Sequence, residues 1–207
     1  MKNENNPAGN FYDKYGTANP IAKALMNGFL KSFDDLVKKA NAKSIYEIGC
    51  GEGHLAIRMA ENGGIVKGSD ISSEIIQEAK KNNQLMKLNI DFQVQSVYNL
   101  TKKDVANPDL IVCCEVLEHL DNPNMALEII KSLNSKYLIV SVPREPIWRI
   151  LNVARGKYWK DLGNTPGHLQ HWSKKSFLHI LKPHFAICEI RSPFPWTMVL
   201  CENLERS

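Results

Sequence analysis

Three side chains that can carry out chemistry, Glu115, Glu118 and His119, directly follow the apolar run 110–114. Their i, i+3 and i+4 spacing places them on one side of the chain if this turn is helical. Two carboxylates and an imidazole can bind a divalent cation such as Mg, Mn or Zn, and the imidazole can also act as a general base without a metal. We therefore expect a catalytic group here. Three roles stay open for His119: metal ligand, base, or hydrogen-bonded structural group.

A second pair of imidazoles lies further along the chain, in the segment Gly167-His-Leu-Gln-His-Trp172. Histidine is the commonest metal ligand among the side chains. If a metal is bound, we expect His168 and His171 to complete the ligand set begun by Glu115, Glu118 and His119.

Glycines recur at positions 49, 51 and 53, where the apolar run 44–48 gives way to a helical pattern. Such glycines let the backbone approach a ligand closely, and the start of the helix offers free N–H groups. The residue at the last glycine position of a dinucleotide loop is His54, and no Gly-Lys-Ser/Thr follows, so neither phosphate-binding motif is present. Asp70 ends the next apolar run, where an acid accepts hydrogen bonds from ribose hydroxyls. Glu47 precedes the glycines and suits an ammonium group, so together these residues describe a site for a nucleoside that carries a positively charged amino acid.

These residues need a scaffold, and the chain alternates β-rich runs with helical stretches. Strands are expected at 44–48, 65–69, 91–95, 110–114, 137–141, 185–191 and 198–202, and helices at 20–40, 53–62, 73–83, 123–133 and 174–181. The first five strands are joined by crossover-length segments, which implies parallel strands with helices on both faces. The last two are separated only by the hairpin-length turn 192–197. We therefore predict an α/β doubly wound seven-stranded sheet, mostly parallel, with an antiparallel last strand.

The domain organisation follows from the same pattern. Residues 1–19 are polar and contain Pro, Gly and several Asn, so we expect a flexible N-terminal arm. Residues 20–207 form a single domain. The stretch 143–172 interrupts the alternation after the fifth strand, at the edge where open α/β sheets bind ligands, and predicts a substrate-binding or lid segment. An additional packing helix at 147–154 is the alternative for part of it.

Composition excludes several other classes of protein. The 207 residues are 43% hydrophobic and 23% charged, which rules out a disordered, collagen-like or coiled-coil chain. No apolar run is long enough for a membrane span, and the first residues lack the apolar stretch of a signal peptide. The five cysteines are an odd number and lie mostly in apolar runs, so we expect reduced, buried thiols in a cytoplasmic protein. The net charge of +4 is uneven, because the segment 144–191 holds nine Lys/Arg and three Asp/Glu.

With these motifs in order, the chain resembles the class I S-adenosylmethionine-dependent methyltransferases. Glu47-x-Gly-x-Gly-x-Gly53 looks like their first motif, Val66-Lys-Gly-Ser-Asp70-Ile-Ser like their second, and 109–120 like their fourth strand and the loop after it. The resemblance implies a Rossmann-like fold and S-adenosyl-L-methionine as cofactor, with Asp70 on the ribose, Ile71 on the adenine, and Ser96 where many members have an acid on the adenine amino group. The implied cofactor-binding set is Glu47, Gly49, Gly51, Gly53, Asp70, Ile71, Ser96, Val97 and Glu115.

The Glu-x-x-Glu-His turn is similar to that of two groups in this family. One is the ubiquinone-pathway O-methyltransferases, which act on small phenols; the other is the small-RNA 2′-O-methyltransferases. We expect O-methylation of a small-molecule or glycan-type acceptor, anionic if the basic residues Arg144, Arg149 and Arg155 contact it. Two alternatives stay open: an RNA 2′-O-methyltransferase with a metal site, and a non-catalytic module that binds the cofactor.

Overall fold

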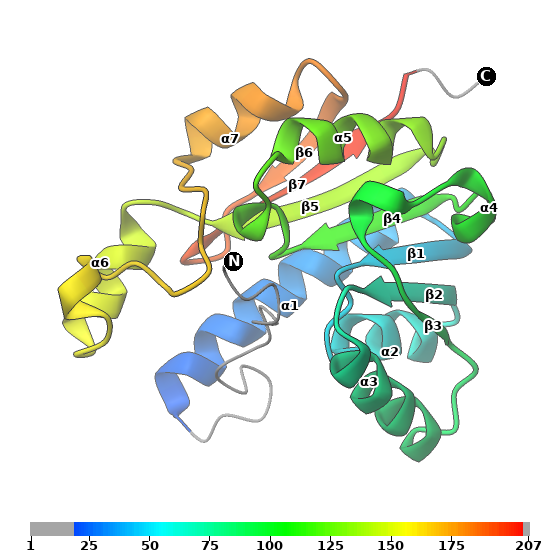
Figure 1. Ribbon diagram of the computed structural model, residues 1–207, viewed down its shortest axis with the longest axis horizontal. Helices are drawn as coiled ribbons and strands as arrows, with labels where there is room; N and C mark the ends of the chain where they lie inside the picture. The colour runs from blue at the N-terminus through cyan, green and yellow to red at the C-terminus, as the bar shows by residue number, and fades with distance from the viewer. Residues whose placement is uncertain (1–18, 205–207) are drawn as a thin grey trace, which may run out of the picture.

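A seven-stranded sheet forms the centre of the protein in a computed structural model that describes residues 19–204 (Figure 1). Its order is β3-β2-β1-β4-β5-β7-β6, and β7 alone runs antiparallel to its neighbours. The strands are β1 (Ser44–Ile48), β2 (Ile65–Asp70), β3 (Asp91–Val94), β4 (Leu110–Cys114), β5 (Tyr137–Pro143), β6 (Ala186–Arg191) and β7 (Trp196–Glu202). This confirms the predicted α/β sheet, whose strand limits are correct to within two residues.

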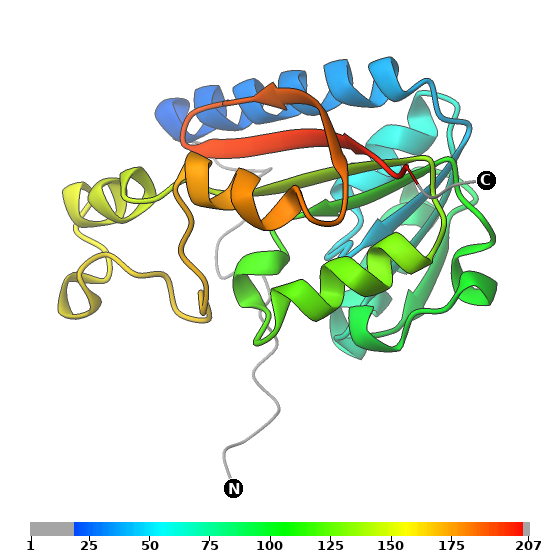
Figure 2. The same cartoon turned by 90° about the horizontal axis from the view of Figure 1, so that it is seen from above.

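Helices cover both faces of this sheet. They are α1 (Pro20–Ala40), α2 (His54–Glu61), α3 (Ser73–Leu85), α4 (Lys102–Val105), α5 (Pro123–Ser132), α6 (Ile147–Ala154) and α7 (Lys174–Leu181), with single turns η1 (Val97–Asn99), η2 (Leu117–His119) and η3 (Trp159–Asp161). One side of the sheet holds α1 and the other holds α5 and α7 (Figure 2). The predicted packing helix at 147–154 is α6, which extends from one end of the sheet in both views.

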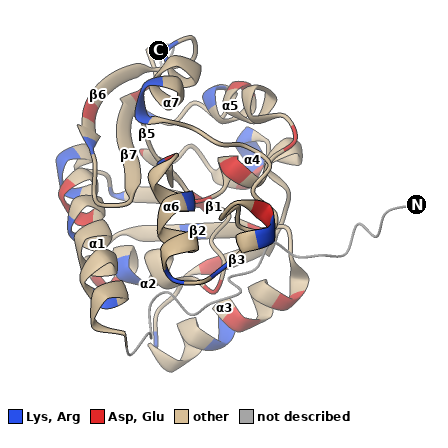
Figure 3. Cartoon of the chain, turned by 90° about the vertical axis from the view of Figure 1, so that its left-hand side faces the viewer, with Lys and Arg blue, Asp and Glu red and all other residues tan. Residues whose placement is uncertain are grey.

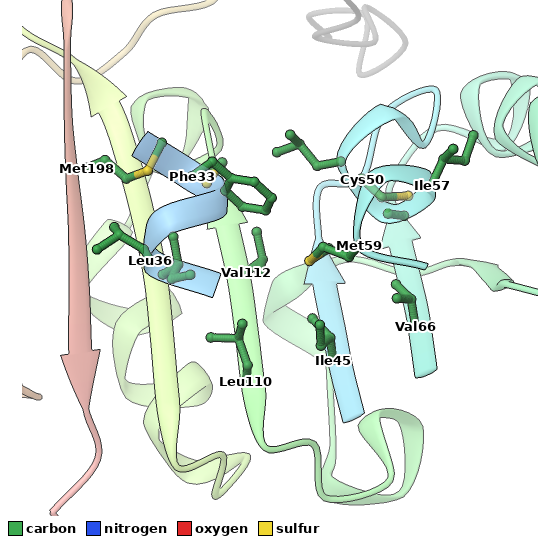
Figure 4. Packing of buried hydrophobic residues seen from close by; sticks show 14 of the residues in the cluster. Phe33, Leu36, Ile45, Cys50, Ile57, Met59, Val66, Leu110, Val112 and Met198 are labelled. Carbon is green, nitrogen blue, oxygen red and sulfur yellow. The ribbon is translucent and has the colours of Figure 1, made fainter. Parts of the chain in front are cut away.

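The alternation of side chains along the strands divides the core into two layers. In β4, Leu110 and Val112 face the layer that contains α1 and α2, whereas Ile111 and Cys113 face the layer under α5 and α7. All five β4 residues are buried, as expected for a parallel strand covered on both faces. The first layer is drawn in Figure 4, where Phe33 lies beside Val112. The apolar run read from the sequence is therefore the middle of the core.

Helix α1 begins at the N-cap residue Asn19 and buries the side chains of one face. Asn19 accepts hydrogen bonds from the backbone N–H groups of residues 21 and 22, and Pro20 occupies the first helical position, where its missing N–H costs nothing. The buried side chains follow a helical period: Met26, Phe29, Phe33, Leu36 and Ala40. The predicted arm over residues 1–19 lies outside the described residues, apart from Asn19.

The cysteines differ from the prediction at one position. Four are buried free thiols, but Cys188 is exposed on β6, an edge strand of the sheet. Between residues 19 and 204, no helix is long and apolar enough to span a bilayer.

The site at the end of the sheet follows from the topology. The chain crosses in opposite directions from β1 to β2 and from β4 to β5, so the strands β1 and β4 lie side by side with their carboxyl ends at the same edge. Loops that leave such adjacent strands diverge and leave a crevice between them.

We expect Phe33→Ala to lower the free energy of unfolding by about 3–5 kcal/mol, because it empties a fully buried site between α1 and the sheet. Leu85→Ala, at a side chain that is 79% exposed, is the control and changes stability by less than about 0.5 kcal/mol. Urea denaturation followed by tryptophan fluorescence measures both. Similar small losses in the two variants would show that α1 does not contribute to the cooperative core.

Candidate active site

A cavity of about 1130 Å³ opens at the carboxyl ends of β1, β2, β3 and β4. Its floor is made by the loops that follow these strands, and its walls by the first turns of α1, by α6 and by the loop 157–168. Small-molecule pockets usually measure about 300–1,000 Å³. The cavity therefore has room for two small molecules at once.

The glycine loop and Asp70 form one hydrogen-bonded unit in the floor of this cavity. The loop glycines all have positive φ, +68° at Gly49, +53° at Gly51 and +84° at Gly53. The Gly51 N–H donates to Asp70 Oδ2 at 3.1 Å, and the Ser72 N–H donates to Asp70 Oδ1 at 3.0 Å. The carboxylate is thus fixed at the end of β2 with its remaining lone pairs towards the cavity, which it lines.

Glu47 is a buried carboxyl in the same floor. Its side chain is 3% exposed, and the backbone N–H of Ala56, in the first turn of α2, donates to it. Burial raises the pKa of Glu47 well above its ordinary value of 4.5, and the nearby Asp70 carboxylate raises it further. Among the residues that the structure describes, Glu47 Oε2 has no hydrogen-bond partner. An acceptor without a donor in a cavity floor suits a cationic ligand group.

The remaining predicted cofactor residues lie on the side of the cavity formed by β2 and β3. Ile71 is 70% exposed, so it offers an apolar surface to a flat ring. The Ser96 hydroxyl accepts a hydrogen bond from the Tyr98 N–H at 3.3 Å and caps the turn η1, whose first residue, Val97, is buried. All three predicted residues, Ile71, Ser96 and Val97, line the cavity.

Glu115 does not join Glu118 and His119, contrary to the predicted cluster. It has φ of +59° and lies before the turn η2, so the three residues do not share one helical turn. Its carboxylate instead accepts hydrogen bonds from Trp196 Nε1 at 2.7 Å and from Ser141 Oγ at 3.0 Å. Glu115 lines the cavity, but as a link between β4, β5 and β7.

Glu118, His119 and His168 do come together. One potential ligand atom from each lies within 4.8 Å of the others, Glu118 is 1% exposed, and the two imidazole rings meet edge to face with centroids 4.9 Å apart. His119 Nδ1 lies 2.9 Å from the Gly167 carbonyl oxygen. Because that oxygen can only accept, Nδ1 carries the proton, and in a neutral ring Nε2 is then the unprotonated nitrogen. The cluster therefore presents an imidazole in a fixed tautomer.

The predicted ligand His171 does not reach this cluster. Its Nε2 atom lies 2.7 Å from Asn164 Oδ1, and the side chain is exposed. The segment 165–171 is an irregular loop, so the spacing of His168 and His171 does not direct both rings the same way.

The loop that carries His168 is attached directly to the turn after β4. The N–H groups of Leu169 and Gln170 donate to the Glu118 carbonyl oxygen at 2.8 and 3.0 Å, and Gln170 Nε2 donates to the Leu120 carbonyl oxygen at 3.0 Å. These backbone contacts place His168 and the Gly167 carbonyl beside His119.

A series of aromatic rings packs against the cluster through His168. Trp148 on α6 stacks on His168 with centroids 6.2 Å apart and lies 5.7 Å from Trp196, which in turn meets Phe29 edge to face at 5.1 Å. Trp148 Nε1 donates to the Thr165 hydroxyl at 2.9 Å. A tryptophan that is largely buried and donates its N–H to one partner is typical of an apolar pocket with a single polar contact. Sequence spacing does not reveal such ring contacts, because the rings come from distant parts of the chain.

Comparison with known proteins agrees with this geometry. A sequence model described as a methyltransferase domain matches residues 39–182. The ubiquinone biosynthesis O-methyltransferase of Coxiella burnetii (strain RSA 331 / Henzerling II) is 30% identical over 154 residues, covering 67% of this chain and 64% of that protein. The match thus spans less than two thirds of the relative's length.

Solved structures extend the similarity to the fold. Magnesium protoporphyrin IX methyltransferase from Synechocystis PCC 6803, with bound SAH, superposes with a TM-score of 0.68 at 22% identity, covering 90% of this chain and 89% of that one. The methyltransferase domain of bacterial CtHen1-CN gives a TM-score of 0.67 at 21% identity, with 86% and 99% coverage.

We expect the stability of the ligand-free protein to depend on Glu47 in a defined direction. Its folded pKa lies above the unfolded one, so its contribution is fully present below pH 4.5 and is lost as the pH rises towards the folded pKa. Glu47→Gln removes this loss, so its stability relative to the unmodified protein increases as the pH rises from about 5 to about 8. Chemical denaturation across that range tests this, with Glu61→Gln at an exposed position as control. If unfolding free energy changes with pH in the same way for the protein and its Glu47→Gln variant, the pKa of Glu47 is not raised in the folded protein.

We also expect Gly49→Ala to destabilise the protein more than Gly63→Ala. Both glycines have positive φ, at +68° and +88°, so each alanine adds about 1–2 kcal/mol of backbone strain. A Cβ at Gly49 would also lie 2.3 Å from Val116 Cγ2, whereas nothing lies within 4 Å at Gly63. Equal losses of unfolding free energy in the two variants would show that the loop moves away from Val116 without cost.

Proposed function

Because the chain belongs to the class I S-adenosylmethionine-dependent methyltransferase family, we propose that its cavity binds S-adenosylmethionine across the glycine loop. Asp70 accepts hydrogen bonds from the ribose hydroxyls, and Ile71 packs on the adenine ring. The ammonium group of the methionine part lies near Glu47, whose unmatched buried oxygen supports this orientation. The backbone of Gly49 and Gly51 packs along the methionine chain. The sulfonium methyl then faces the Glu118–His119–His168 cluster.

The proposed acceptor is a hydroxyl group of a small molecule. The observation that carries this proposal is the hydrogen bond from His119 Nδ1 to the Gly167 carbonyl, which makes Nε2 the unprotonated nitrogen of a neutral ring in a residue that lines the cavity. The name of the Coxiella relative, an O-methyltransferase, supports oxygen as the methylated atom.

The reaction is an in-line displacement at the methyl carbon. The acceptor O–H gives its proton to His119 Nε2 while an oxygen–carbon bond forms. The sulfur–carbon bond breaks, and its electron pair returns to sulfur, so the products are a methyl ether and S-adenosylhomocysteine. The Glu118 carboxylate in the same cluster stabilises the imidazolium that forms. Holding donor and acceptor in line supplies much of the rate enhancement.

A second candidate uses a divalent cation at the same cluster. One carboxylate and two imidazoles, from Glu118, His119 and His168, are a donor set that suits Zn or Mn better than Mg. Glu115, which holds Trp196 and Ser141, is not part of this set. When bound, such a cation would hold the acceptor oxygen and lower the pKa of its hydroxyl.

Calorimetric titration with S-adenosylhomocysteine, in chelator and again with added Mn²⁺, tests the cofactor site first. We expect binding in both buffers and none to Asp70→Ala. Methylation of a catechol probe is then measured in the same two buffers. Turnover that persists in chelator supports the base, whereas turnover that requires the metal supports the cation. Binding without turnover of any acceptor indicates a cofactor-binding module, and turnover of RNA alone indicates an RNA methyltransferase.

We expect His119→Ala to lower kcat/KM for the catechol probe by about 10²–10⁴-fold, the usual contribution of a general base. Cofactor affinity should stay within about twofold, since the cofactor contacts lie on other loops. His171→Ala is the matched control and should leave both constants unchanged, because that ring bonds Asn164 outside the cluster. An active His119→Ala variant would eliminate both the base and the cation site.

A further inference from the structure

The charges that line the cavity are separated by sign. Six acids line it, and all lie near the carboxyl ends of β1, β2 and β4 or in the segments that follow these strands: Glu47, Glu52, Asp70, Glu74, Glu115 and Asp121. Among the described residues, the lysine and arginine side chains that line it are Arg155 and Lys157, both from the segment after α6. The part of the chain around α6, here called the α6 lobe (residues 144–172), lies over this end of the sheet. In Figure 3 it carries blue segments, which mark Lys and Arg.

Arg155 and Lys157 both form hydrogen bonds with one buried residue, Asn152. Asn152 is 1% exposed, and its Nδ2 donates to the Gly163 carbonyl oxygen at 2.7 Å and to the Thr165 hydroxyl at 3.1 Å. Its Oδ1 accepts a hydrogen bond from Arg155 Nη2, and its backbone carbonyl accepts one from the Lys157 N–H at 2.8 Å. A guanidinium has five N–H donors, and the bond to Asn152 uses one of them.

The other arginines named in the sequence analysis have different positions. Arg149 donates to the carbonyl oxygens of Leu162 and Asp161 at 3.1 and 3.5 Å and so holds the turn η3 against α6. Arg144 and Arg149 do not line the cavity. The cationic side of the site is therefore defined by Arg155 and Lys157.

The wall next to these two cations is largely apolar. Trp148, Leu151 and Tyr158 come from the α6 segment, and Ile21 and Leu25 come from α1. Trp148 also contacts His168, so this wall continues to the proposed base. A ligand that lies along it meets an imidazole at one end and two cations at the other.

We propose that the methyl acceptor is a small hydroxylated molecule with an apolar or aromatic body that also carries a carboxylate or phosphate group, bound by Arg155 and Lys157. This inference rests on the proposed function, because it assigns the half of the cavity that the cofactor leaves open. The anionic group complements the only cationic part of the described cavity wall. Arg155 binds it through planar paired N–H groups, and Lys157 acts as a point charge.

Three probes separate charge from shape: 3,4-dihydroxybenzoate, its neutral methyl ester, and 3,4-dihydroxybenzyl phosphate. In Arg155→Gln and in Lys157→Gln we expect kcat/KM for the anionic probes to fall about tenfold or more, the effect of losing a charged hydrogen bond. The methyl ester should change less than about twofold in both variants. Lys160→Gln, at an exposed lysine of the same lobe that does not line the cavity, is the matched control and should affect no probe.

The outcomes distinguish this inference from the proposed function. Equal losses for the ester and the anions, or no loss at all, would overturn the anion site while methyl transfer stands.

If no probe is methylated, calorimetric titration of the S-adenosylhomocysteine complex decides: binding of an anionic probe that is weakened in Arg155→Gln supports the anion site, and no such binding overturns it. The carboxylate and phosphate probes separate the two anion classes. Methylation of a short RNA in preference to all three probes would also overturn the inference.

Discussion

The parallel pairing of β1 with β4 is the contact on which the cavity depends. Its register places Glu47 beside Val112, so the glycine loop and the turn after β4 leave the sheet next to each other. There the backbone of Gly49 lies against Val116, at a distance that no side chain at position 49 would allow. Glycine is needed for its positive φ and for this close approach. Because the glycine loop and the turn that carries His119 leave the sheet side by side here, the rest of the site is positioned relative to this contact.

The sheet and the cofactor half of the site are predictable from sequence because the signals are local. Apolar runs such as Leu110–Cys114 are buried on both faces, so their composition alone identifies the central strands. The hairpin-length turn before β7 fixes its antiparallel direction. Asp70 and the glycine loop are separated by one helix and one strand, and the hydrogen bond between Gly51 and Asp70 spans 19 residues. The motif order therefore already places both in one crevice.

The acceptor half is not predictable in the same way, because backbone conformation and distant partners decide where its side chains lie. Glu115 has a left-handed backbone, which a Glu-x-x-Glu-His spacing does not reveal, and its partner Trp196 lies 81 positions away. His119 is oriented by a carbonyl 48 positions away. Their spacing groups Glu115 and His171 with Glu118, His119 and His168, whereas in the structure both make other contacts.

These long-range contacts attach the segment that follows α6 to the turn that carries Glu118 and His119. Leu169 and Gln170 bond the carbonyl of Glu118, while Gly167 fixes the tautomer of His119. If the loop leaves this position, the His119 ring loses the acceptor that keeps the proton on Nδ1. The proton can then move to Nε2, the nitrogen proposed to act as the base. The same loop is held by Asn152, which also accepts a hydrogen bond from the Arg155 guanidinium. If the acceptor binds at Arg155 as proposed, its binding stabilises the arrangement in which the proposed base, His119, keeps its proton on Nδ1, so acceptor recognition and the state of the base would depend on one docked segment.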